Sequence, residues 1–129
     1  SKFGSEVSGN TIDAINFYKD WFGGNDERSI VAGDFNNSII WDKKGNDNNF
    51  NNINDHFVDL GFVSNYHKLK DEGFGKESYA TFFHTKKESK KYHIDYIYSK
   101  NLNPLELKVG SYTEWISYSD HSPLIAELG

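Results

Sequence analysis

Apolar and polar positions in the first half of the chain switch between helical and strand-like spacing. Apolar residues recur every three or four positions from 12 to 22, which predicts a helix that Thr11 caps and Gly23-Gly24 ends. The short apolar run Ser29–Ala32 predicts a buried strand. A second helix is expected from about Asn51 to Leu60, and Phe62–Tyr66 is expected to form a strand.

The second half of the chain is dominated by alternating patterns that are typical of antiparallel strands. The expected strands are Tyr79–His84, Tyr92–Ser99, Leu105–Val109 and Pro123–Leu128. In the third of these, Leu105, Leu107 and Val109 should share one face. In the last, Leu124, Ala126 and Leu128 should alternate with Ile125 and Glu127. The polar segment 86–91 is expected to be a solvated hairpin tip.

These elements predict one α/β domain over residues 1–129, with residues 1–10 as a Ser- and Gly-rich leader or linker. The expected architecture is one mostly antiparallel mixed sheet with about two helices on one face. Aromatic residues make up 16% of the chain, so the core must rely on rings, as a disordered chain could not. No apolar stretch approaches the roughly 20 residues needed to span a bilayer, and we expect a cytoplasmic protein.

The absence of cysteine limits the chemistry of any site. Disulfides, zinc–thiolate centres and Cys nucleophiles are excluded. A metal would be held by carboxylate, amide and imidazole groups, a set that suits Mg²⁺, Mn²⁺ or Ca²⁺. The net charge of −5 argues against a dedicated nucleic-acid binder, but not against an enzyme that contacts a phosphodiester through a metal.

The first segment with candidate chemistry is Gly33-Asp34-Phe35-Asn36, directly after the buried strand. If extended geometry continues, Asp34 and Asn36 point to the same side and could together orient a water or grip an oxyanion. The alternative is a simple turn, because Gly, Asp and Asn dominate turns.

The second segment is Ser119-Asp120-His121-Ser122-Pro123, before the last predicted strand. Here Asp120 could bind a metal, and His121 could contact a phosphate or transfer a proton near neutral pH. The alternative is a loop in which Asp120 caps a turn and Pro123 opens the strand.

The third segment, Tyr92–Tyr98, is a predicted strand that contains a carboxylate. Ile94, Tyr96 and Tyr98 should share one face, with His93 and Asp95 on the other. A carboxylate among apolar residues is costly unless it is paired, and histidine is a natural partner. The alternatives are a solvated strand face or a structural pair of His93 and Asp95.

Taken in order, these three segments resemble motifs of the endonuclease/exonuclease/phosphatase superfamily. That superfamily includes deoxyribonuclease I, exonuclease III, sphingomyelinases and inositol polyphosphate phosphatases. Ala80-Thr81-Phe82-Phe83 resembles a further family segment, and the match covers about residues 28–129. The closest likeness is to bacterial exonuclease III-like proteins, through the segments Trp41–Lys44 and Glu114–Ile116.

The resemblance implies a role for each matched residue. Asp34 would position or deprotonate the attacking water, and Asn36 would hydrogen-bond that water or the phosphate. Asp95 would orient His121, which contacts the phosphate, and Asp120 would bind Mg²⁺ or Mn²⁺ together with Asp34. We therefore expect Asp95 within hydrogen-bond reach of His121, and Asp34 and Asp120 in one cleft.

The resemblance also implies that the chain is the C-terminal half of a four-layer α/β sandwich. The family's N-terminal half supplies further metal ligands, so we expect the isolated chain to be weakly active or inactive. The exposed inner face of the sheet would favour pairing with the missing half or with a second copy.

The sequence leaves several substrate classes open. DNA or RNA is favoured by the likeness to exonuclease III, while lipid and inositol phosphates are alternatives. A rival reading from another class is a non-catalytic half-domain that acts as an interaction module. A Ser–His–Asp hydrolase is disfavoured, because Ser122 adjoins His121. His56, His67 and His84 are weak candidates, and Trp41 and Trp115 are expected to pack rather than to face substrate.

Overall fold

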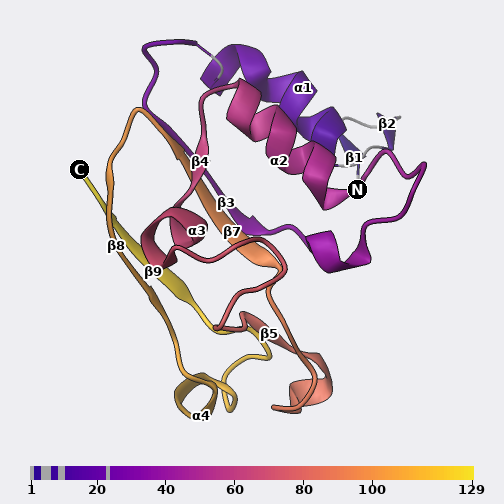
Figure 1. Cartoon of the computed structure of the whole chain (residues 1–129), viewed down its shortest axis with the longest axis vertical. Helices are drawn as coiled ribbons and strands as arrows, with labels where there is room; N and C mark the ends of the chain where they lie inside the picture. The colour runs from indigo at the N-terminus through magenta and orange to yellow at the C-terminus, as the bar shows by residue number, and fades with distance from the viewer. Residues whose placement is uncertain (1, 4–6, 9–10, 23) are drawn as a thin grey trace.

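The computed structural model describes every residue except 1, 4–6, 9–10 and 23, and has the α/β architecture shown in Figure 1. Its centre is a three-stranded antiparallel sheet. The middle strand β7 (Asp95–Lys100) pairs with β3 (Ser29–Asp34) on one side and with β4 (Val63–Ser64) on the other. The β3–β7 register places Asp34 opposite Asp95.

Helices α1 (Thr11–Phe22) and α2 (Phe50–Asp59) lie side by side (Figure 1) and cover one face of this sheet. The apolar face of α2 follows helical spacing and is fully buried. Its Phe57 stacks on Tyr98 at 4.2 Å between ring centroids, and Phe50 stacks on Tyr96 at 4.6 Å. Aromatic packing therefore forms most of the core, as the composition predicts.

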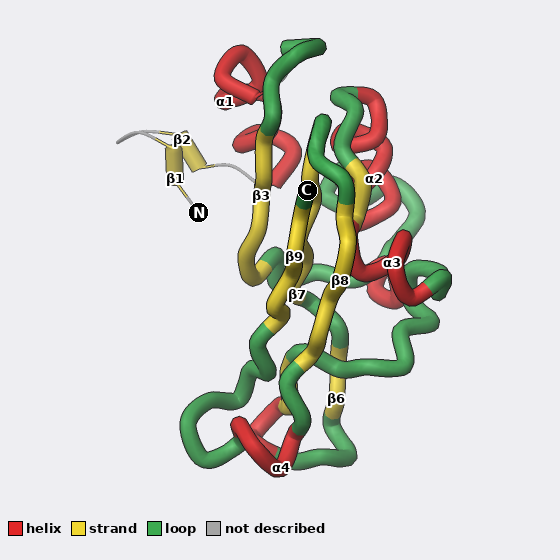
Figure 2. The backbone as a smooth tube through the Cα atoms, turned by 90° about the vertical axis from the view of Figure 1, so that its left-hand side faces the viewer, coloured by secondary structure: helices red, strands yellow, loops and turns green. Residues whose placement is uncertain are grey.

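A second layer of structure is the antiparallel hairpin of β8 (Pro104–Val109) and β9 (Leu124–Leu128). The hairpin runs alongside the central sheet (Figure 2), where β9 contacts β7 and β8 contacts α3 (Asn65–Lys70). The remaining elements are short: β1 (Lys2–Phe3), β2 (Val7–Ser8), η1 (Ile39–Trp41), β5 (Phe82–Phe83), η2 (His84–Lys86), β6 (Lys91–Tyr92) and α4 (Tyr112–Trp115).

The predicted fold class is confirmed, but the expected single mixed sheet is not found. The described strands form one three-stranded and three two-stranded sheets, and all their pairings are antiparallel. Of the predicted leader, β1 and β2 pair with each other, and the other residues of 1–10 lie outside the described part of the chain. No described helix is long and apolar enough to cross a membrane.

Three of the predicted strands differ in the structure. Segment 62–66 yields only the two-residue β4, because the chain turns at Asn65 into α3. Tyr79–His84 is reduced to β5. The predicted strand Tyr92–Ser99 is broken between β6 and β7, because the backbone N–H groups of Ile94 and Asp95 both donate to Thr81 Oγ1, at 3.0 and 3.2 Å.

The alternation expected for β8 is also wrong at one position. Leu105 is 50% exposed, whereas Leu107 is buried. A register shift between Pro104 and Glu106 inserts an extra residue there, and a bulge of this kind turns the next side chain to the other face. The alternation expected for β9 is confirmed, with Ile125 and Glu127 exposed and their neighbours half-buried.

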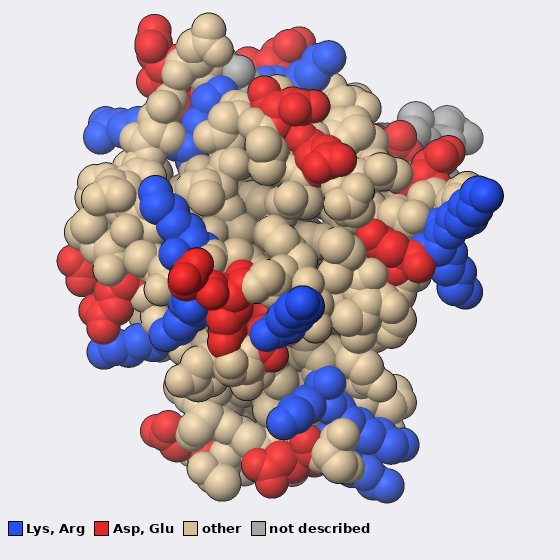
Figure 3. Space-filling model, viewed as in Figure 1, with Lys and Arg blue, Asp and Glu red and all other residues tan. Residues whose placement is uncertain are grey.

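Charged side chains are spread over the surface in the view of Figure 3, where acidic and basic groups intermingle. Basic groups gather at the lower right of that view, over the β5–β6 hairpin. The lysines of this tip, Lys86, Lys87, Lys90 and Lys91, are all exposed, as a solvated hairpin tip requires.

Candidate functional site

Three of the predicted site residues meet on the sheet face opposite the helices. Asp34 is the last residue of β3 and Asp95 is the first of β7, and their backbones are paired in register. His121 comes from the loop before β9. The expectation that Asp95 lies within hydrogen-bond reach of His121 is confirmed, since the two side chains are 2.9 Å apart.

The His121 ring lies between two carboxylates. Its Nδ1 is 2.9 Å from Asp95 Oδ2, and its Nε2 is 3.7 Å from Asp34 Oδ2. Side-chain exposure rises along this row, from 17% for Asp95 to 30% for His121 and 48% for Asp34. The buried carboxylate therefore accepts the Nδ1 proton and orients the ring, while Nε2 and Asp34 remain accessible to a ligand.

Burial dominates the electrostatics of Asp95. It raises the pKa of the Asp95 carboxyl above its ordinary value, because desolvation disfavours the charged form. Hydrogen bonds with Thr81 and His121 and the charge of His121 oppose this effect, and the nearby Asp34 adds to it. Ionised Asp95 is thus held at a cost in folding free energy, a pattern common at functional sites.

Local backbone contacts fix the loop that carries His121. The backbone N–H of His121 donates to Ser119 Oγ at 3.0 Å, and that of Ser122 donates to the carbonyl of Thr81 at 2.8 Å. His121 also forms a β-bridge with Phe82, whose ring centroid lies 4.9 Å from the imidazole. The segment 80–83 therefore supports both Asp95 and His121.

A cleft of about 630 Å³ opens beside the three residues. Besides Asp34, Asp95 and His121, its lining consists of Ala32, Gly33, Tyr96, Ile97, Trp115, Ser119, Ser122, Pro123 and Leu124. Trp115, which is 38% exposed, is among the residues that border this cleft, whereas the sequence favoured a packing role for it.

Asn36 lies outside the residues that line the cleft. Its φ is +50°, in the left-handed region, and its backbone N–H donates to Asp34 Oδ1 at 2.7 Å. Extended geometry therefore stops at Asp34, and the expectation that the two side chains share one direction is wrong. The segment is a turn, as its composition also allowed, and the turn fixes the Asp34 carboxylate.

Asp120 is not among the residues that line the cleft, so the expectation that it lies in one cleft with Asp34 is not confirmed, and its metal-binding role stays a prediction. Its carbonyl accepts the backbone N–H of Phe83 at 2.8 Å, beside the bridge between Phe82 and His121.

The residues present fit a hard divalent cation in part. Asp34, Asp95 and His121 each offer a ligand atom within 4.8 Å of the others. Mg²⁺ often uses one or two carboxylates, with water and substrate phosphate as its other ligands. Asp34, the most exposed of the three, is the group that could hold it, since Asp95 and His121 engage each other.

Comparisons with known proteins add no further assignment: no family model matches the chain, and no curated protein matches it.

Proposed function

We propose that this chain is part of a phosphoesterase of the endonuclease/exonuclease/phosphatase superfamily, which hydrolyses phosphodiester bonds with Mg²⁺ or Mn²⁺. The observation that carries the proposal is the row Asp34–His121–Asp95 in an open cleft. These residues come from the three segments that resemble the family's motifs, and Asp95 contacts His121 as the resemblance implies.

The chemistry follows from the exposure of each group. Asp34 orients a water and accepts its proton as the water oxygen bonds to phosphorus. The phosphorus–oxygen bond to the leaving alcohol breaks in the same step, and the alcohol oxygen takes a proton from solvent. His121 Nε2–H stabilises the negative charge that develops on the phosphoryl oxygens, and Asp95 keeps the imidazole oriented through Nδ1–H. A divalent cation at Asp34, when bound, would neutralise charge on the phosphate.

Among phosphodiesters, a nucleic acid fits the cleft best. Trp115 borders the cleft and can stack on a base, a contact available to any nucleotide. The net charge of −5 is compatible with a substrate held locally by a metal rather than by a basic surface. Lipid and inositol phosphodiesters share the reacting group, so assays distinguish them from DNA or RNA.

The test is hydrolysis of bis-p-nitrophenyl phosphate, plasmid DNA and sphingomyelin, with Mn²⁺, Mg²⁺ or EDTA. In the full-length phosphoesterase we expect metal-dependent cleavage of DNA, reduced at least about a hundredfold in Asp34→Ala and His121→Ala. The isolated chain should be weakly active or inactive. The exposed residues Asp59 and His84 supply the controls Asp59→Ala and His84→Ala. Asp120→Ala, outside the cleft, should retain more activity than Asp34→Ala.

A second readout does not depend on turnover. Paramagnetic Mn²⁺ should broaden the NMR signals of Asp34 and His121 at concentrations that leave His84 sharp. In the full-length protein, activity of His121→Ala equal to that of the unsubstituted protein would overturn the assigned role. Absence of both turnover and selective broadening would overturn the proposed function.

A further inference from the structure

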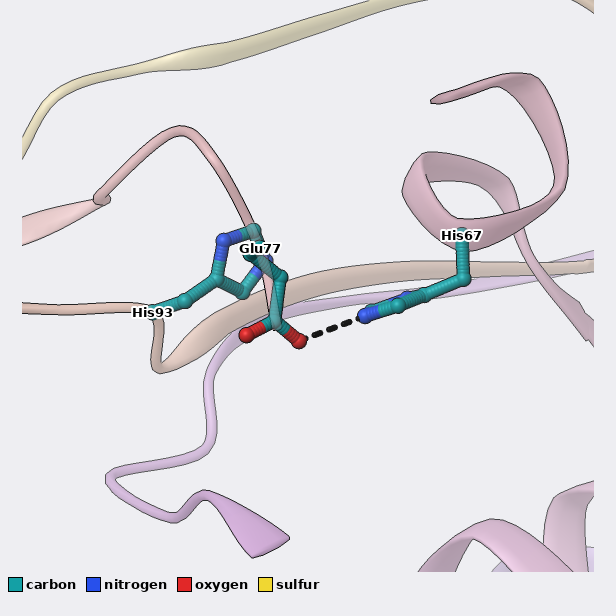
Figure 4. Close-up of side chains that lie close together, drawn as sticks. All are labelled: His67, Glu77 and His93. Atoms are coloured by element: carbon teal, nitrogen blue, oxygen red, sulfur yellow. Dashed lines mark hydrogen bonds and ion pairs between the residues drawn. The ribbon is translucent and has the colours of Figure 1, made fainter. Parts of the chain in front are cut away.

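A second cluster of titratable side chains lies away from the cleft, on the other side of the strand break at 93–94. It consists of His67 from α3, Glu77 from the loop that follows, and His93 between β6 and β7 (Figure 4). All three are buried: side-chain exposure is 7% for His67 and 5% for Glu77, and residue exposure is 5% for His93. The side chains converge from three separate segments, and their ligand atoms lie within 4.8 Å of one another.

His93 provides the observation that points to a ligand. Its Nδ1 donates to the carbonyl of Tyr79 at 2.9 Å, so its Nε2 carries a lone pair. That Nε2 is buried and has no hydrogen-bond partner. Buried polar atoms are rarely left unsatisfied, and an exception calls for an explanation such as an ion.

His67 and Glu77 are held by groups outside the cluster. His67 Nδ1 contacts Ser64 Oγ at 2.6 Å, which leaves its Nε2 directed at Glu77 Oε2, also at 2.6 Å. Glu77 Oε2 accepts the backbone N–H of Gly75 at 3.1 Å. Both histidines therefore bind a supporting group through Nδ1 and turn Nε2 inward, the arrangement that orients histidine ligands of metals.

We propose that His67 Nε2, His93 Nε2 and the Glu77 carboxylate form a binding site for Zn²⁺. Two imidazoles and one carboxylate are a known zinc ligand set, and imidazole favours zinc over Mg²⁺ or Ca²⁺. When zinc binds, His67 changes tautomer: its ring proton moves from Nε2 to Nδ1. The Nδ1–H then donates a hydrogen bond to Ser64 Oγ. Zinc bonds of about 2.0–2.1 Å at tetrahedral angles separate ligand atoms by about 3.3 Å, so the His67–Glu77 contact has to open by less than about 1 Å.

A cavity beside the cluster leaves space for a fourth ligand. A small cavity of about 140 Å³ borders Glu77 and His93 and is lined in addition by polar groups of Ser38 and Ser78. It has room for the water that completes a three-residue zinc site. Lys91, at its exposed rim, can turn its ammonium into solvent.

The electrostatics agree with this geometry. Burial lowers the pKa of the His93 imidazole, which keeps the ring neutral and able to bind a metal. Burial would raise the pKa of the Glu77 carboxyl, but the hydrogen bond from His67, with help from backbone N–H groups and His93, holds it below its ordinary value. At neutral pH the cluster thus offers the Glu77 carboxylate and the neutral His93 imidazole.

The test is titration of the metal-free chain with Zn²⁺ by calorimetry and with Co²⁺ by visible absorption. We expect one equivalent of Zn²⁺ and the intense Co²⁺ bands of a tetrahedral site. The chain has no cysteine, so these bands come from nitrogen and oxygen ligands. His93→Asn keeps a donor for the Tyr79 carbonyl and removes Nε2. It should weaken binding more than the about 10–100-fold typical of losing a supporting residue.

Two further variants locate the site. Asp34→Ala removes a ligand from the cleft and should leave the Zn²⁺ equivalent intact, and His84→Asn, at an exposed histidine, is the control for His93→Asn. Loss of Zn²⁺ binding in Asp34→Ala but not in His93→Asn would place the ion in the cleft and overturn the proposal. Failure of the folded, unsubstituted chain to bind Zn²⁺ would also overturn the proposal. The contact between His67 and Glu77 would then be a hydrogen-bonded pair that binds no metal.

A measurement on the unsubstituted chain covers the case in which the variants fail to fold. Zn²⁺ should shift the imidazole NMR signals of His67 and His93 at one equivalent, and leave those of His56, His84 and His121 unchanged. Shifts at His121 instead would contradict the assignment.

Discussion

The imidazole Nδ1 of His121 lies 2.9 Å from the Oδ2 of Asp95, although 26 positions separate the two residues. The contact exists because β7 begins at Asp95 and the loop before β9 bridges to Phe82. The central sheet therefore orients the His121 ring. The other ring nitrogen, Nε2, faces the exposed carboxylate of Asp34.

Replacing Asp95 by Asn should separate stability from function. The pKa of the Asp95 carboxyl is higher in the folded chain than in the unfolded chain. As the pH rises from the unfolded pKa through the folded pKa, the contribution of Asp95 to stability is therefore lost. At neutral pH the ionised carboxylate costs free energy of folding. Asp95→Asn removes this cost. We expect its unfolding free energy, relative to the unsubstituted chain, to increase from acid to neutral pH, while hydrolysis falls.

Urea denaturation at several pH values, alongside the phosphodiester assay, measures both effects. Asp59→Asn, at an exposed position, is the control. Parallel losses of stability and activity at neutral pH would show that Asp95 is structural and has no role in positioning His121.

Thr81→Val should destabilise the chain strongly, although it only replaces a hydroxyl group by a methyl group. The Thr81 hydroxyl oxygen is buried and accepts the backbone N–H groups of Ile94 and Asp95. Each buried donor left unpaired costs about 1–3 kcal/mol, so for two donors we expect a loss of about 2–6 kcal/mol in chemical denaturation. Thr113→Val, at an exposed position of α4, is the matched control, and an equal loss there would refute the explanation.

Glu72 is expected to control stability in acid. Hydrogen bonds from Ser78 and, more weakly, Tyr66 lower the pKa of the Glu72 carboxyl from 4.5 to about 2. This stabilisation is complete above about pH 4.5 and is lost as the pH falls towards 2, because the unfolded chain takes up the proton first. Glu72→Gln should flatten the decline in unfolding free energy over this range, whereas Glu88→Gln, at the exposed hairpin tip, should not.

Gly110→Ala should disturb the wall of the cleft. A Cβ at Gly110 would lie 2.6 Å from Pro123 Cδ and 2.6 Å from the Trp115 ring, and both residues line the cleft. Overpacking of this kind typically costs about 1–3 kcal/mol. We expect a lower unfolding free energy and altered tryptophan fluorescence. Gly73→Ala, whose nearest neighbour would be a flexible lysine carbon at 3.9 Å, should change neither.

Periodicity was sufficient for the parts of the fold that local spacing controls. The helix expected over 12–22 and the second helix correspond to α1 and α2 within one or two residues, because a fully buried apolar stripe such as that of Phe50, Ile53 and Phe57 leaves no other way to pack. Motif order was sufficient to predict the pairing of Asp95 with His121.

Spacing could not predict features that depend on single backbone conformations or on distant partners. The positive φ of Asn36 ends the extended geometry on which its predicted direction rested, and the bulge before Glu106 reverses Leu105. The cluster of His67, Glu77 and His93 joins three segments through tertiary structure alone. In the sequence, His93 stood out only as a possible structural partner of Asp95, and His67 only as an isolated histidine.

The interruption of the strand at His93–Ile94 separates the two clusters of titratable side chains. In an unbroken strand, His93 and Asp95 would share one face, and their two clusters would compete for the same ions and protons. The break, maintained by the Thr81 hydroxyl, sends the imidazole to one side and the carboxylate to the other. Thr81, which belongs to neither cluster, thus keeps His93 and Asp95 in two separate sets of ligand groups.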